Sequence, residues 1–177
     1  DTLRRLTLYR LRADVRIAPA PLHVLRGLGP APAGALSDPR HPALGYRLWS
    51  ETPGTPPAID WDAIRVAHLI PESGIELSPD ETYILEAGFE RLHGVDFRKG
   101  CYVGQEVTAR MKHKTELRRG LVRFRVDGAA AVGTEVLAEG RVIGRLYTQA
   151  QGQGIGLVRL DQMTAPLTAG SARLSPA

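Results

Sequence analysis

The chain has 177 residues, a formal net charge of +4 and 43% hydrophobic residues, which is enough for one good core or two small ones. It has no apolar run of about 18 residues and no signal or transit pattern, so we expect a soluble cytoplasmic protein without membrane partners. Cys101 is the one cysteine. This excludes an internal disulfide. It also excludes a metal or cluster site that needs several cysteines of this chain alone.

The first half of the chain mixes helical and strand signals. Residues 1–18 read as a helix end running into a strand at 14–17, and because Asp rather than Met stands first we expect further sequence upstream. A Pro-, Gly- and Ala-rich segment follows, with short apolar pieces at 22–28 and 45–49 that predict strands between turns. Residues 59–69 predict a helix with Asp60 as N-cap.

The second half changes character after a helix expected at 105–114. Short β-rich runs separated by turn signals predict a small antiparallel barrel from about residue 117, with strands at 117–126, 135–138, 142–148, 154–160 and 172–174. We interpret the glycines at 152, 154 and 156 as turn residues of one hairpin, not as a dinucleotide fingerprint. The predicted fold class is therefore α+β, ending in a small antiparallel β-barrel.

Positive charge is concentrated in residues 91–125. This segment holds ten Lys or Arg against three acids, and it includes all three lysines of the chain. Such a cluster suits an anionic ligand or partner, and the alternative is a solvated positive face without one.

Cys101 has surroundings that favour a thiolate. Arg98 and Lys99 precede it, and the helix expected at residue 105 would direct its free N–H groups towards it. We expect a partly exposed thiol in a turn that faces a cavity; the alternative is a buried, inert cysteine. His93 or His113 as a base would make a cysteine hydrolase, the least favoured alternative. None of the five histidines has metal-ligand spacing, so no metal site is expected.

A longer motif surrounds this cysteine. Residues 99–106 read Lys-Gly-Cys-Tyr-Val-Gly-Gln-Glu, and further matching residues occur at 65–71 and at Glu86-Ala87. On these residues the chain resembles the C-terminal part of the YgfZ family, folate-binding proteins that support iron–sulfur cluster assembly. Leu69 departs from the family pattern, which has glycine there, and Ile84 or Leu85 stands where proline often precedes the glutamate.

The resemblance implies a folate-binding fold shared with GcvT, the aminomethyltransferase of the glycine cleavage system. Residues 1–115 would form the C-terminal part of the folate-binding region, with its N-terminal part missing, and residues 116–177 the barrel domain. Tetrahydrofolate is the implied cofactor, with Trp61 matching a folate-linked tryptophan whose indole can stack on an aromatic ring; the alternative is that Trp61 is a helix residue covering the core. The folate-binding candidates are Trp61, Tyr102, Gln105 and Glu86, and the candidate functional residues at the thiol are Cys101 and Lys99.

The implied function is a folate-dependent accessory factor that assembles or repairs [4Fe–4S] proteins. Its partners would be folate and iron–sulfur proteins or their assembly factors, and we do not expect a conventional enzyme. An aminomethyltransferase is the alternative, although that enzyme family lacks the cysteine motif. Nucleic-acid binding is disfavoured because only three aromatic residues, Phe97, Tyr102 and Phe124, lie among the cations, where base stacking needs several exposed aromatic side chains.

Overall fold

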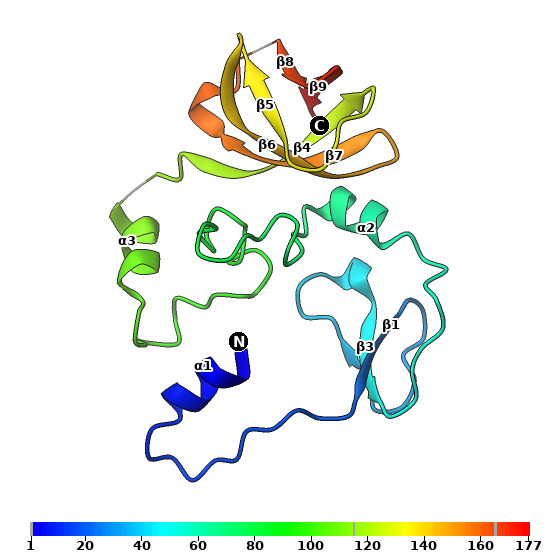
Figure 1. The fold of residues 1–177 in the computed structure, drawn as a ribbon, viewed down its shortest axis with the longest axis vertical. Coiled ribbons are helices and arrows are strands. Elements are labelled where there is room, and N and C mark those ends of the chain that lie inside the picture. The colour runs from blue at the N-terminus through cyan, green and yellow to red at the C-terminus, as the bar shows by residue number, and fades with distance from the viewer. Residues whose placement is uncertain (1, 115, 165) are drawn as a thin grey trace.

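The computed structural model describes residues 2–114, 116–164 and 166–177. The C-terminal residues form a barrel, and a small sheet lies at the far side of the molecule from it (Figure 1). The helix α2, Trp61–His68, lies next to the barrel, and a long run of turns connects it to α3, Glu106–Lys114. Within the described ranges no helix has the length and apolar character needed to cross a membrane.

The N-terminal helix α1, Thr2–Tyr9, has no buried residue. The strand expected at 14–17 is wrong, because no strand of the described chain pairs with this segment and supplies backbone hydrogen bonds. The strands expected at 22–28 and 45–49 are present as β1, His23–Gly27, and β3, Tyr46–Ser50. Both are antiparallel, and a two-residue strand β2, Leu36–Ser37, completes the sheet in the order β1-β3-β2.

The helix α2 begins and ends as its sequence predicts. Asp60 is the N-cap, and its carboxylate accepts a hydrogen bond from the backbone N–H of Ala63 at 2.9 Å. The helix ends at Leu69, which has left-handed backbone angles of φ 52° and ψ 46°. The backbone N–H of Ile70 then donates to the carbonyl of Arg65 at 2.9 Å. Leu69 thus takes the conformation that glycine adopts without steric cost.

The barrel closes through six antiparallel strands in the order β4-β7-β6-β5-β8-β9. They are β4 Arg119–Asp127, β5 Thr134–Ala138, β6 Arg141–Ala150, β7 Gln153–Arg159, β8 Leu167–Ala169 and β9 Ala172–Pro176. Short 3-10 helices lie at Pro42–Leu44 and Leu160–Gln162. The predicted α+β class with a terminal barrel is confirmed, while β8 was not predicted. The expected domain boundary falls at residue 115, which lies outside the described residues.

The barrel core contains Phe124, Leu146 and Val158, all fully buried. Two glycines of β7 make room for it: a Cβ on Gly156 would lie 2.6 Å from the Phe124 ring, and one on Gly154 would lie 3.0 Å from Leu146. Their interpretation as turn residues is therefore wrong, because they are strand residues that admit large core side chains. Gly152, with φ 71°, is the turn residue of that hairpin.

A buried polar network joins α2 to the barrel. The Arg65 guanidinium donates to Glu76 Oε2 at 2.9 Å and to Thr148 Oγ1 of β6 at 2.7 Å. Glu76 also accepts from the backbone N–H of Thr148 at 3.2 Å. Each of the three side chains belongs to a buried residue. Since the network spans helix, turn region and barrel, it fixes how these parts pack.

Candidate functional site

The loop that carries Cys101 is exposed to solvent. Cys101 itself is exposed, in agreement with the expectation, and Val103 beside it is almost fully exposed. Gly100 and Gly104 have φ values of 90° and 89°, and a Cβ on either would meet no other atom within 4 Å. The glycines are thus needed for their backbone conformation and not for space. The loop leaves the thiol accessible to solvent.

Interactions within the loop bring four of the predicted residues together. The Lys99 ammonium lies 4.9 Å from the centroid of the Tyr102 ring, which is a cation–π distance. Gln105 Oε1 accepts a hydrogen bond from the backbone N–H of Tyr102 at 3.1 Å. Gln105 therefore closes the turn just before α3 begins at Glu106. Cys101, Lys99, Tyr102 and Gln105 form one local unit, which we call the thiol loop.

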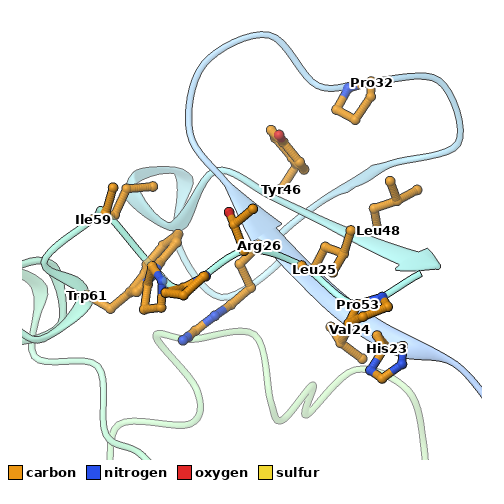
Figure 2. Close-up of a pocket in the computed structure, with 15 residues that line it drawn as sticks. His23, Val24, Leu25, Arg26, Pro32, Tyr46, Leu48, Pro53, Ile59 and Trp61 are labelled. Atoms are coloured by element: carbon orange, nitrogen blue, oxygen red, sulfur yellow. The ribbon is translucent and has the colours of Figure 1, made fainter. Parts of the chain in front are cut away.

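Trp61 lies elsewhere, in a pocket of about 780 Å³ between the small sheet and the segment 53–59. Only 9% of Trp61 is exposed, and the Arg26 guanidinium lies 4.5 Å from its ring centroid. Figure 2 shows Arg26 reaching past Trp61 at one end of the pocket, with Tyr46 and Leu48 projecting from β3. The volume is within the range of small-molecule sites.

The chemistry of this pocket suits a planar ligand with a negative charge. Its lining combines apolar side chains with Arg26, His23 and Tyr46, and no carboxylate of the described chain lines it. Sequence analysis did not identify Arg26 and Tyr46, which lie in a segment with few motif residues. The sequence signal available there was the pair of short apolar pieces at 22–28 and 45–49. In the structure they pair as β1 and β3, which places Gly27 opposite Tyr46.

Glu86 occupies a third place. Its backbone carbonyl accepts a hydrogen bond from Leu121 N–H at 3.2 Å, which holds it against β4 of the barrel. The Oε2 atom is buried and has no hydrogen-bond partner in the part of the chain that the structure describes. Burial raises the pKa of Glu86, and the nearby positive charge of Arg119 opposes that rise. Glu86 does not line the Trp61 pocket.

The structure thus distributes the predicted residues over three places. The thiol loop leads into α3, whereas Trp61 begins α2, and these two helices lie on opposite sides of the molecule (Figure 1). Cys101 lines neither the Trp61 pocket nor the hollow beside His68 described below, so the expectation that it faces a cavity finds no support there. The roles assigned to these residues stay predictions.

The two histidines considered as bases have other surroundings. His113 makes an edge-on ring contact with Phe97 at 6.2 Å, and His93 lies in a turn with φ 58°. Across residues 2–114, 116–164 and 166–177 no group of three His, Cys, Asp or Glu is placed to hold a metal ion.

Two cations of the basic segment have acidic partners. Lys112 pairs with Glu90 at 2.7 Å and lies over the Phe97 ring, while Arg98 pairs with Asp96 at 3.3 Å. Both ion pairs are exposed and contribute little to stability.

Comparison with known protein families identifies the barrel. Residues 118–177, which contain β4 to β9, match the family described as CAF17, C-terminal beta-barrel domain.

The whole chain is similar to iron–sulfur cluster assembly factors of the IBA57 type. It is 31% identical to iron-sulfur cluster assembly factor IBA57, mitochondrial, of Homo sapiens, over 93% of this chain and 54% of that protein. The Mus musculus protein of the same name is 29% identical over the same shares. The mitochondrial IBA57 homolog of Neurospora crassa is 41% identical over 53% of this chain and 22% of that protein. The chain spans about half the length of the first two relatives.

Proposed function

We propose that this chain is an accessory factor in iron–sulfur cluster assembly, of the folate-binding YgfZ type, and that Cys101 is its functional thiol. The observation that carries the proposal is the exposed Cys101 in a preorganised loop, in a chain similar to proteins named as iron–sulfur cluster assembly factors. Its partners would be iron–sulfur proteins or their assembly factors. The thiol serves in transfer, in redox chemistry or as a transient ligand.

The thiol loop suits a role in contact with another protein. A cysteine binds iron as a thiolate, and Lys99 lies two residues from Cys101 in the sequence. The Tyr102 ring holds the Lys99 ammonium at 4.9 Å. Since the loop is exposed, a cluster-bearing partner can approach the sulfur without a prior opening of the fold.

Complementation tests this role. Cys101→Ser in the full-length protein, expressed in a strain that lacks the gene, should fail to restore the activity of [4Fe–4S] enzymes, because serine forms no thiolate at neutral pH. Val103→Ala is the matched control, since it changes an exposed side chain of the same loop and should complement fully. Full complementation by Cys101→Ser would overturn the proposal. The motif would then act through Lys99, Tyr102 or its backbone.

Folate is the second part of the proposal. The Trp61 indole lines the pocket and also packs in a core cluster with Leu44, Ile70 and Leu92. The Arg26 guanidinium beside it can pair with the carboxylate of a ligand that has a glutamate tail. Glu86, the other folate candidate outside the thiol loop, lies at a separate place and does not line this pocket, so its role stays a prediction. When bound, tetrahydrofolate would supply one-carbon or redox chemistry, and the chain's residues would hold and orient it.

Tryptophan fluorescence tests folate binding, because the chain has two tryptophans with different surroundings. Trp61 is 9% exposed in the pocket, whereas Trp49 is 50% exposed. Tetrahydrofolate added to the full-length protein should quench emission in the Trp49→Phe variant. The Trp61→Phe variant should lose the signal and bind more weakly by calorimetry. Unchanged folate affinity in the Trp61→Phe variant would show that folate does not bind in the Trp61 pocket.

The cytoplasm is the location we propose, although the relatives cited above carry the word mitochondrial in their names. Cell fractionation with an antibody against the full-length protein tests it. Recovery in an organelle fraction would overturn it.

A further inference from the structure

A second hollow lies where α2 meets the barrel. Its volume is about 410 Å³, and four side chains that can carry positive charge line it: His41, His68, Arg91 and Arg123. They come from the start of a 3-10 helix, the end of α2, the turn region and β4. Figure 1 shows α2 directly beneath the barrel, where these segments converge. We call this cavity the basic hollow.

Neither arginine of the basic hollow has a carboxylate partner among the described residues. The Arg123 guanidinium donates to the carbonyl of Ala67 at 2.6 Å. Arg91 donates to the carbonyls of His68 at 2.9 Å and Leu69 at 2.7 Å. These bonds satisfy the last carbonyls of α2, but a guanidinium has five N–H donors. The Nε of Arg123 is buried and unpartnered, so a buried donor remains available.

The two histidines add further donors. Their rings stack with centroids 4.1 Å apart. His41 Nδ1 accepts a hydrogen bond from Ala43 N–H at 3.1 Å, so the ring proton of neutral His41 lies on Nε2. The pKa of His68 is lowered by burial and then by the positive charges of His41, Arg123 and Arg91. An anion in the hollow would relieve this repulsion and favour the protonated ring.

We propose that the basic hollow binds a phosphate-type oxyanion, held by the Arg91 and Arg123 guanidiniums and assisted by His41 and His68. The arginine N–H groups that the α2 carbonyls leave free can donate to an oxyanion, and no Asp or Glu side chain of the described chain lines the hollow. The site is separate from the thiol loop and from the Trp61 pocket, and it stands independently of the proposed function. Free phosphate and the phosphate group of a small metabolite share this chemistry.

Binding is measured by calorimetry on the full chain. Inorganic phosphate, glycerol phosphate and sulfate are each titrated against potassium chloride of equal ionic strength. We expect saturable binding of inorganic phosphate or glycerol phosphate, and the tighter of the two identifies the source. Arg91→Gln and Arg123→Gln should each weaken it about tenfold, as expected for a lost charged hydrogen bond. The matched control is Arg125→Gln, which removes the same charge from an exposed position on the same strand and should leave affinity unchanged.

The pH dependence provides a readout that does not depend on whether Arg123→Gln folds. Sulfate stays doubly charged near neutral pH, so tighter sulfate binding at about pH 6 than at about pH 7.5 reports histidine protonation. A His41→Gln, His68→Gln double variant should lose this dependence. No binding beyond the chloride control overturns the proposal, and so does equal weakening by Arg125→Gln or a pH dependence that survives in the double variant.

Discussion

The Arg65 guanidinium donates a 2.9 Å hydrogen bond to Glu76 Oε2, and both residues are only 1% exposed. Thr148 of the barrel bonds to both side chains, with 2.7 Å from Arg65 and 2.5 Å to Glu76 Oε1. Arg65 also pairs with the more exposed Asp62 and Glu72, at 3.0 and 3.1 Å, so Glu76 is the buried member of its acidic surroundings. The pair of Arg65 and Glu76 therefore links the packing of α2 to that of the barrel.

Glu76→Gln should lower the free energy of unfolding by about 1–3 kcal/mol, because Arg65 loses its buried carboxylate partner but keeps the more exposed Asp62 and Glu72. Urea denaturation followed by circular dichroism measures the change. Glu135→Gln is the control: its pair with Arg145 at 3.3 Å is half exposed, so the loss should stay within about 1 kcal/mol. Equal losses in the two variants would contradict the structural role of the network.

Leu69 tests the backbone at the end of α2. Leu69→Gly should be more stable than Leu69→Ala by about 1 kcal/mol, since both lose the side chain but only glycine relieves the φ of 52°. At Ala67, inside the helix, glycine should be worse than alanine. Ala67→Gly should lower the free energy of unfolding by about 1 kcal/mol. Thermal unfolding of the variants measures both differences. An alanine variant at Leu69 as stable as the glycine variant would show that the left-handed conformation is not retained.

Asp38 should make stability depend on pH. Burial alone would raise the pKa of Asp38, but hydrogen bonds from Arg40 and Arg47 outweigh it and hold the pKa well below its usual range. A carboxyl group whose pKa is lowered by folding stabilises the fold at pH values above its unfolded-state pKa of about 4. This contribution is lost as the pH falls towards the pKa in the folded state.

The free energy of unfolding of the Asp38→Asn variant should therefore be about 2 kcal/mol lower than that of the wild type at neutral pH. This difference should become smaller below about pH 4. Denaturation in urea at several pH values measures the gap. The exposed Asp127 is the control position, where Asp127→Asn should change stability little at either pH. A constant gap across the acid range would contradict the role of Asp38 ionisation.

Cys101 should be alkylated by iodoacetamide in the native protein, because its side chain is exposed. Mass spectrometry should find one adduct per chain, since Cys101 is the one cysteine. Lys99→Gln should slow the reaction about twofold to threefold, as expected for an exposed charge interaction, whereas Lys99→Arg should not. Reaction only after unfolding would contradict the exposed thiol loop.

Local interactions explain what the sequence predicted correctly. The Asp60 cap of α2, the start of α3 beside Gln105 and the paired strands β1 and β3 depend on residues close in sequence. The family resemblance identified the thiol loop, whose glycines indeed have positive φ. The short strand β8 was missed because three residues carry too little pattern to predict a strand.

By itself, the sequence determined the α+β class, the barrel and the position of the thiol between two glycines, because these follow from periodicity and turn chemistry within a few residues. Only the tertiary structure decided which distant side chains meet. Arg65 bonds to Thr148 across 83 positions, and Arg123 bonds to Ala67 across 56. Such contacts depend on how α2 packs on the closed barrel, which no local pattern encodes. The Arg65 network and the basic hollow are therefore products of packing, whereas the thiol loop is a product of sequence.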